Sequence, residues 1–411
     1  MRSGSHLEAA AAERVIVHMD VDAFAVAVER LRDKRLVGRP VLIGAQGARA
    51  LVLSASSEAR QRGVYPGMPV RQARALCPEA AVVQGDFAHY HRVSDTLRAL
   101  VQEQVPLLEF AAQDEFYLDL TGMDRYFGCF QFAQELKTYI RKETGLTVSF
   151  AQATTKPTAK VATDDVRPDG AREISPGTER AYLAPLPVRR LPGVGRETQA
   201  QLHDIGIREV RAMQAVPPEA MERLLGRPGL TLWHRAHGTD RSPVVAYSER
   251  KAIHREQVFT LDTIDIPALR ALLVWMAEDI GHELRASERL TANLTVRIRY
   301  SNGDTQTKSA RLPYTALDPV LIEEALRLFD RVYERRMTLR LLGLEASHLV
   351  PGGIQLSLLD DRPEQMALLS AIDKMKHRFG TTSVQQGRSL KAYERKGKTD
   401  KGWWRGIRAR I

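Results

Sequence analysis

The sequence predicts a multidomain α+β protein, and three observations lead to that prediction. The chain has 411 residues, which is enough for two to four domains of ordinary size. Short apolar runs typical of strands alternate with runs of helical periodicity. A proline-bearing stretch at 185–192 and a change of pattern near residue 251 divide the chain into at least three parts.

The first part begins with a strand expected at 15–22, which ends in two aspartates and is followed by a helix from Phe24. The spacing of apolar residues and of glycine turns places the remaining elements. Not all of these strands need parallel crossovers, and this favours an α+β layer. Further strands are expected at 41–44, 50–54, 107–110, 116–120 and 146–153, and further helices at 56–63, 130–143 and 156–164.

The second and third parts have different patterns. The stretch at 185–192 is typical of a linker, and short helices with glycine turns follow it to about residue 240. The last part alternates helix and strand in a βαβ-like order, which predicts a small α/β sandwich. Its elements are expected as a helix at 266–288, a strand at 290–300, a helix at 319–335, a strand at 340–349 and a helical stretch at 363–380.

Composition excludes several classes of protein. No apolar run approaches the roughly 20 residues that a membrane span needs, so an integral membrane protein is not expected. Cys77 and Cys129 are the only cysteines of the sequence, which excludes a disulfide framework and a cysteine zinc site. The first residues lack the apolar core of a signal peptide. We therefore expect a cytoplasmic protein.

The charge balance points to a polyanionic partner. Sixty Lys and Arg residues against fifty Asp and Glu give a net charge of +10. Neutralising phosphates releases their counterions, so basic proteins bind nucleic acids readily. Ribosomal proteins, chaperones and merely basic proteins share this feature, and the charge alone does not separate them.

Two acidic pairs suggest a metal site. Asp20 and Asp22 are two apart on the first expected strand, so their side chains should share a face. Carboxylates on one face repel unless they are protonated or bridged by a cation. Asp114 and Glu115 interrupt an apolar run, and a bend at 111–113 would let both reach one site. Oxygen ligands without histidine or cysteine favour Mg²⁺ or Mn²⁺. Solvated acids at strand ends are the alternative.

Two cations and a glycine turn suggest phosphate binding. Arg60 and Lys160 lie on expected helices, and cations beside a carboxylate cluster suit a triphosphate; solvated surface charges are the alternative. The glycines of the LPGVG sequence at 191–195 would let backbone N–H groups approach a phosphate. This turn is typical of helix-hairpin-helix DNA binders, with an ordinary αα-hairpin as the alternative.

Together these segments resemble the Y-family (translesion) DNA polymerases, most closely the bacterial polymerase IV type. The resemblance covers about residues 14–350 and rests on five motifs in the family's order. They are HMDVDAF at 18–24, the finger motif within 54–69, QDEFYLD at 113–119, Lys156 with Ala159-Lys160, and LPGVG at 191–195.

The resemblance implies a right-hand polymerase with a palm, small fingers, a helical thumb containing the helix-hairpin-helix, and an α/β little finger. The implied boundaries are 14–31 and 88–180 for the palm, 32–87 for the fingers, 181–245 for the thumb, 250–350 for the little finger and 351–411 for a C-terminal tail.

The resemblance also implies the chemistry. Asp20, Asp114 and Glu115, with the carbonyl of Val21, would hold two Mg²⁺ ions, which Mn²⁺ could replace. One ion would activate the primer 3′-hydroxyl and the other would neutralise the triphosphate. The expected activity is template-directed DNA synthesis of low fidelity in DNA damage tolerance, without proofreading.

The implied partners are primer–template DNA, nucleoside triphosphates and a sliding clamp, with no membrane and a monomeric enzyme. Arg60 and Lys160 would hold the β and γ phosphates. The implied nucleotide contacts are Ser57, Arg60, Lys160, Phe24 and Ala25, and the implied DNA contacts are Gly193, Val194 and Gly195.

Four positions depart from the family's pattern. Ser57 replaces a tyrosine that contacts the triphosphate, Ala112 replaces a serine, and Phe116 stands at a usually small position. Ala25 replaces the aromatic residue that excludes ribonucleotides, so weak sugar discrimination is expected. In the alternative, Phe116 or a shifted Phe24 refills the space.

The C-terminal tail contains a short docking motif. Gln355, Leu356, Leu358 and Leu359 resemble the peptide by which bacterial polymerases bind the sliding clamp, and a plain linker is the alternative. Residues 391–411 are basic and contain Trp403 and Trp404, which suits a nucleic-acid-binding arm or a disordered end.

Three functions therefore compete. The first is an active polymerase, the second is a catalytically inactive polymerase-like DNA-binding scaffold, and the third is a structural helix-hairpin-helix DNA-binding protein. The intact acids Asp20, Asp114 and Glu115 speak against the second. The third leaves the embedded acids and the finger motif unexplained.

Overall fold

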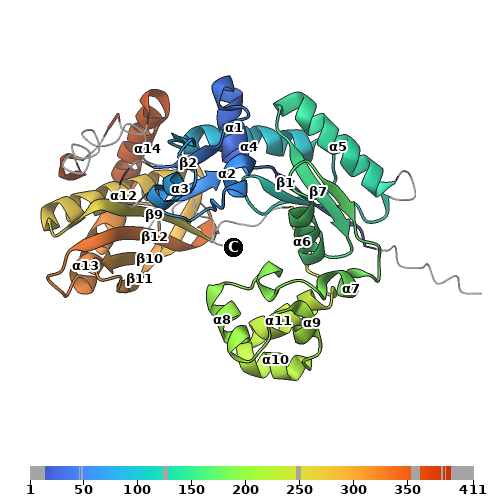
Figure 1. The fold of residues 1–411 in the computed structure, drawn as a ribbon. Helices are drawn as coiled ribbons and strands as arrows, with labels where there is room; N and C mark the ends of the chain where they lie inside the picture. Colours follow the sequence, from blue (N-terminus) through green and yellow to red (C-terminus); the bar gives the residue numbers. More distant parts are fainter. Residues whose placement is uncertain are drawn as a thin grey trace, which may run out of the picture. The chain divides into compact units, whose positions relative to one another are not determined.

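The structure, a computed structural model, describes residues 14–45, 47, 50–123, 128–246, 251–352, 362–380, 383–384 and 386–389. The described residues up to 246 form one compact unit and those from 251 form a second (Figure 1). The peptide at 355–359 and the basic segment at 391–411 lie outside the described residues.

A five-stranded sheet, here the central sheet, organises the first unit. Its order is β5-β6-β1-β7-β8, and β1 is antiparallel to both of its neighbours, whereas β8 runs parallel to β7. This mixed pairing confirms the expected α+β class. The strands are β1 (Ile16–Val21), β5 (Leu108–Phe110), β6 (Glu115–Asp119), β7 (Val148–Ala153) and β8 (Ala171–Glu173).

The two faces of the central sheet have different neighbours. Val17, Met19 and Val21 of β1 pack in a core with α1 (Phe24–Arg32), α4 (Phe87–Gln102) and α5 (Cys129–Thr144). Alternate side chains of a strand point to opposite faces, so His18 and Asp20 point to the other face. There α6 (Lys156–Val166) covers part of the sheet (Figure 1). The polar residues of β1 therefore gather on the face that carries α6.

A small sheet of order β3-β2-β4 and two short helices follow α1 in the chain. The helix α2 begins after Ser56, whose side chain accepts a hydrogen bond from the amide of Ala59, as an N-cap residue does. The elements are η1 (Lys34–Leu36), β2 (Val41–Gly44), β3 (Val52–Ala55), α2 (Ser57–Gln61), α3 (Val70–Leu76) and β4 (Ala81–Val83).

A cluster of short helices completes the first unit. The expected linker at 185–192 is wrong, because Val188 and Leu191 are buried in the core of this cluster and the segment forms part of it. The elements are α7 (Glu179–Leu183), η3 (Val188–Arg190), α8 (Arg196–Asp204), α9 (Val210–Gln214), α10 (Pro218–Leu225) and α11 (Arg227–Ala236).

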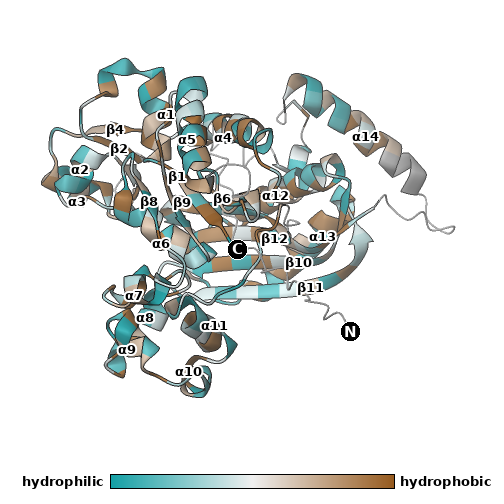
Figure 2. Cartoon of the chain, turned by 90° about the vertical axis from the view of Figure 1, so that its right-hand side faces the viewer, coloured by the Kyte–Doolittle hydropathy of each residue, from teal (hydrophilic) through white to brown (hydrophobic). Residues whose placement is uncertain are grey.

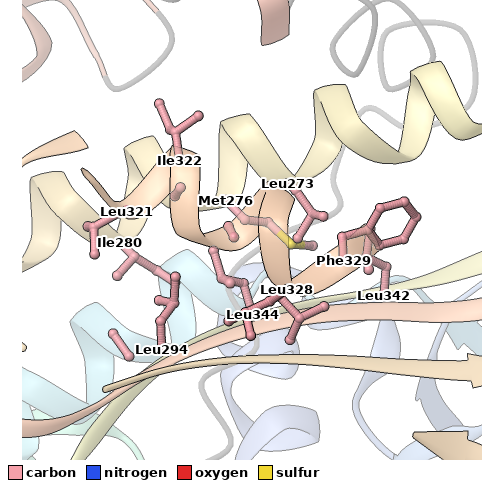
Figure 3. Packing of buried hydrophobic residues seen from close by; sticks show 14 of the residues in the cluster. Leu273, Met276, Ile280, Leu294, Leu321, Ile322, Leu328, Phe329, Leu342 and Leu344 are labelled. Atoms are coloured by element: carbon pink, nitrogen blue, oxygen red, sulfur yellow. The ribbon is translucent and has the colours of Figure 1, made fainter. Parts of the chain in front are cut away.

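The second unit is a four-stranded antiparallel sheet of order β11-β10-β12-β9 with two long helices. Leu273, Met276 and Ile280 of one helix and Leu328 and Phe329 of the other pack on the sheet (Figure 3). The elements are β9 (Ala252–Thr263), α12 (Ile266–Ala286), β10 (Arg289–Tyr300), β11 (Thr305–Thr315), α13 (Asp318–Val332) and β12 (Leu339–Pro351).

The expected βαβ alternation is confirmed, with one strand inserted in each βαβ unit. The helix α12 joins β9 to β10, and α13 joins β11 to β12. In each case the two joined strands run parallel and a third strand lies between them in the sheet. The sequence interpretation missed β9 and β11. Both are edge strands with mostly part-exposed or exposed residues, so the apolar alternation that marks a strand is weak there. In Figure 2 the helices of both units carry teal and brown residues, as expected for helices with one buried face.

The helix α14 (Arg362–Phe379) confirms the expected helical stretch. Its Asp373 accepts hydrogen bonds from Arg285 and lies 2.8 Å from His282 Nδ1, both on α12. Within the described part of the chain, no helix is both long enough and apolar enough to cross a membrane.

Candidate active site

Strand pairing brings the three predicted acids to one end of the central sheet. Asp20 of β1 pairs with Glu115 of β6, so both side chains lie on the face that carries α6. Asp114 precedes β6, and its carbonyl accepts a hydrogen bond of 2.9 Å from the amide of Val21. The chain bends at 111–113, as expected, and two amides of this turn donate to the carbonyl of Glu115.

Asp22 has a different environment from Asp20. It follows the last residue of β1, and its carboxylate accepts hydrogen bonds from Ser149 Oγ (2.8 Å) and from the amide of Asp169 (2.9 Å). An arginine of the chain lies between Asp20 and Asp22, where the sequence interpretation expected a metal ion. The guanidinium of Arg167 lies 2.6 Å from Asp20 Oδ2 and 3.5 Å from Asp22 Oδ1.

The acids are electrostatically coupled. Burial, together with the charges of Asp114 and Glu115, raises the pKa of Asp20 to about 8, although nearby cations oppose this shift. Burial also raises the pKa of Asp114. Burial alone would raise the pKa of Glu115, but its contacts with His18 and Lys160 outweigh burial and lower this pKa to about 2. A cation near Asp20 and Asp114 would stabilise their ionised forms.

The oxygen atoms of this cluster are of the chemical kind that binds a divalent metal ion. Asp20 Oδ1 is buried, and no described residue hydrogen-bonds to it. The carboxylates of Asp20, Asp114 and Glu115 and the carbonyl of Val21 are hard oxygen atoms, the kind of ligand that Mg²⁺ and Mn²⁺ prefer. Among the described residues, no three acidic, histidine or cysteine side chains stand close enough to hold an ion without rearrangement.

Two predicted cations lie beside the acids. Lys160 of α6 forms an ion pair with Glu115. Arg60 of α2 donates from its Nε to the carbonyl of Ala55 (3.0 Å), and its charge interacts with that of Asp20. The fold therefore brings a cation from the small sheet and a cation from α6 to the same acidic site.

The other predicted nucleotide contacts differ in exposure. The ring of Phe24 is buried and meets Tyr90 edge to face, with 6.2 Å between ring centroids. Ala25 is partly exposed and packs at the edge of the core that contains Phe24 and Phe116. Ser57 is exposed at the start of α2. The ring of Phe24 thus belongs to the core, and Ala25 and Ser57 are the accessible members of this group.

The sequence interpretation assigned no role to two residues of the site. His18 is fully buried, and its Nε2 lies 3.0 Å from Glu115 Oε1. Arg167 contacts Asp20 although 147 residues separate them in the chain. The alternation of β1 could have placed His18 on the same face as Asp20. No local pattern distinguishes Arg167 from a surface arginine that follows a helix.

The glycine turn lies between η3 and α8. Gly193 has φ = +95°, in the region that favours glycine. The turn is held from α11, because Arg235 Nη1 donates to the carbonyl of Pro192 (2.7 Å). Gly195 caps α8, and no described heavy atom lies within 4 Å of the place a Cβ would take. The space beside Gly195 is therefore open to a ligand, whereas the amide of Val194 donates to the carbonyl of Leu191 (3.1 Å).

Comparison with known proteins shows the family. The chain matches the impB/mucB/samB family over residues 19–164, the C-terminal domain of that family over 250–358, and the IMS family HHH motif over 176–207. A DNA polymerase IV of Dehalococcoides mccartyi strain BAV1 is 32% identical over 382 residues, which cover 92% of this chain and 98% of that protein. The chain belongs to the Y family of DNA polymerases.

Other Y-family relatives agree. A DNA polymerase IV of Methanoculleus marisnigri is 34% identical (85% of this chain, 98% of that protein), and one of Xanthomonas campestris pv. campestris is 37% identical (78% and 89%). A solved Y-family chimera, Dbh-Dpo4(243-245)-Dbh, matches the fold with a TM-score of 0.71 at 23% identity, covering 82% of this chain and all of its own. The expected Y-family membership and right-hand polymerase fold are confirmed.

Proposed function

We propose that this Y-family chain is a DNA-directed DNA polymerase that carries out translesion synthesis with Asp20, Asp114 and Glu115 as its catalytic acids. The supporting observation is the pairing of Asp20 with Glu115, beside an Asp114 that is bonded to the backbone of Val21. The central sheet is then the palm, the small sheet with α2 and α3 the fingers, the helical cluster the thumb, and the second unit the little finger. We expect a monomer that acts in the cytoplasm.

The roles of the residues follow from their positions. Asp20, Asp114, Glu115 and the Val21 carbonyl would hold two Mg²⁺ ions, which supply Lewis acidity at the primer 3′-hydroxyl and neutralise the triphosphate. Lys160 neutralises Glu115 in the free protein and binds the triphosphate when a nucleotide arrives. Arg60 binds the triphosphate from the fingers side.

The thumb binds the DNA backbone in this proposal. The turn at Gly193–Gly195 approaches a phosphate on its Gly195 side, because the turn has φ = +95° at Gly193 and open space at Gly195. Such contacts carry no sequence information. Affinity for duplex DNA should therefore be independent of sequence and fall steeply with salt as counterions are released.

Replacing Gly195 with alanine tests this phosphate contact. The added methyl group meets no described atom of the protein, so Gly195→Ala should fold normally yet obstruct a phosphate. Hydrogen bonds to charged groups contribute roughly 1.5–3 kcal/mol, so we expect DNA affinity to fall about tenfold with the melting temperature unchanged. Fluorescence anisotropy and thermal unfolding measure the two quantities.

Two further glycines provide the controls. Gly193→Ala should lower the melting temperature, because its Cβ would lie 2.6 Å from Arg235 Nη1 at a positive φ. At Gly387, in the second unit, an added Cβ would have no described heavy atom within 4 Å, and φ is not positive, so Gly387→Ala should change neither quantity. Unchanged DNA affinity in Gly195→Ala would remove the proposed contact.

The peptide at 355–359 is proposed to bind the sliding clamp on the basis of its sequence. Replacing Gln355, Leu358 and Leu359 together with alanine should abolish clamp-stimulated synthesis and leave basal primer extension unchanged. The substitutions remove the side chains that would fill a small apolar pocket on the clamp. Ser357→Ala is the matched control and should keep full stimulation. Stimulation that survives the triple substitution would mean that the segment is a linker.

A further inference from the structure

We propose that Arg167 is an internal counter-ion that occupies the metal-binding oxygens of the free enzyme and is displaced when a divalent cation binds. The inference rests on the proposed catalytic role of Asp20. Arg167 Nη1 lies 2.6 Å from Asp20 Oδ2, and Nη2 donates to the carbonyl of Val21 at 3.1 Å. These two oxygens belong to the two neighbouring groups of β1 that are assigned to the metal.

The guanidinium suits this position. Its planar fork can donate to a carboxylate and a carbonyl at the same time, which a compact ammonium cannot do equally well. Its Nε lies 3.5 Å from Asp22 Oδ1, so all three of its nitrogens face oxygen atoms. The side chain is 21% exposed, and the site around it is only partly solvated.

Asp164 can pair with Arg167 once Arg167 has left Asp20. Asp164 lies one helical turn before Arg167, its Oδ1 is 3.8 Å from Arg167 Nη1, and its side chain is 41% exposed. A rotation of the Arg167 side chain toward Asp164 would keep the guanidinium paired while it releases Asp20 and Val21. An exposed ion pair such as Arg167–Asp164 contributes only about 0–1 kcal/mol. It therefore does not by itself draw Arg167 away from Asp20, and the release of Asp20 depends on the incoming cation.

Displacement lowers the apparent metal affinity of the free enzyme. A metal ion that takes Asp20 Oδ2 and the Val21 carbonyl competes with Arg167 for both atoms, so it binds most tightly to the fraction of molecules in which Arg167 has left. Arg60 differs from Arg167 in this respect because it contacts none of the described groups assigned to the metal, whereas Lys160 contacts Glu115 but neither Asp20 nor Val21. Lys160 pairs with Glu115, and Arg60 donates to the carbonyl of Ala55. Arg60 is therefore a control for simple charge repulsion.

Mn²⁺ binding to the full-length protein, without DNA or nucleotide, tests the proposal. Electron paramagnetic resonance of free Mn²⁺ gives the dissociation constant. Arg167→Gln should bind Mn²⁺ about tenfold more tightly than the wild type, in the range of coupling between competing ligands. Arg167→Lys keeps the charge but not the fork and should lie between them. Because it is conservative, it keeps the test informative if Arg167→Gln fails to fold.

Control variants separate displacement from repulsion. Arg60→Gln should tighten Mn²⁺ binding less than Arg167→Gln, and its effect should fade at high salt, which screens charges that are not in contact. Adding Asp20→Asn to Arg167→Gln should abolish the gain. The proposal is overturned if Arg167→Gln and Arg167→Lys bind Mn²⁺ no more tightly than the wild type, or if Arg60→Gln matches Arg167→Gln.

Primer extension tests the proposed function separately. That function is wrong if the wild type does not extend primers, or if extension does not depend on Asp114. A wild-type Mn²⁺ affinity in the Arg167 variants, together with Asp114-dependent synthesis, would reject the counter-ion and leave the polymerase assignment intact.

Discussion

Asp114→Asn is expected to reduce primer extension by about a thousandfold, the upper end of what the loss of one preorganised electrostatic group costs. The amide replaces the carboxylate with little change in volume, and the hydrogen bond from Val21 to Asp114 uses only backbone atoms, so the fold should persist. What is lost is a negative charge at the proposed metal site. Single-turnover primer extension with Mg²⁺ measures the effect.

Asp119→Asn is the matched control, because Asp119 lies at the opposite end of the same strand from Glu115. Asp119 pairs with Ile16, and its Oδ1 accepts a hydrogen bond from the amide of Thr121. This variant should keep wild-type extension. DNA affinity should be unchanged in both variants. If the wild type binds DNA but does not extend primers, the chain is a scaffold; if Asp114→Asn retains more than a tenth of the activity, the catalytic assignment is wrong.

Ribonucleotide insertion is the second large expected effect. The side chain of Ala25 is partly exposed and ends at one methyl group, so the sugar 2′-hydroxyl should meet little resistance. Forcing extra atoms into a packed site costs about 1–3 kcal/mol. Ala25→Phe should therefore increase the preference for deoxyribonucleotides by about 5- to 150-fold. Single-nucleotide insertion kinetics with matched ribo- and deoxyribonucleotides measure this preference.

The packing of the surrounding core defines the alternative. Phe24 and Phe116 are both buried in the core at whose edge Ala25 packs, so either ring could restrict the sugar without an aromatic residue at position 25. Ala25→Ser changes the size of the side chain little and should leave the preference unchanged. A preference of several thousandfold in the wild type that Ala25→Phe does not alter would show that the gate lies elsewhere.

The sequence alone determined the elements with strong local patterns and singled out the candidate acids. The central strand β1, the helices α5 and α12 and the strands β10 and β12 follow from apolar periodicity, because each buries one face over most of its length. The edge strands β9 and β11 bury too little to leave such a pattern. Asp114 and Glu115 were predicted because charge inside an apolar run calls for a partner, and Asp20 because it shares a strand face with Asp22.

The tertiary structure alone decided which groups meet around those acids. The strand order β5-β6-β1-β7-β8 places Glu115 beside Asp20, and the packing of α6 on that face brings Lys160 to Glu115. Arg167 reaches Asp20 across 147 residues of sequence. A local pattern records whether a residue is buried, but a contact between distant residues depends on the order of the strands and on the face that each helix covers.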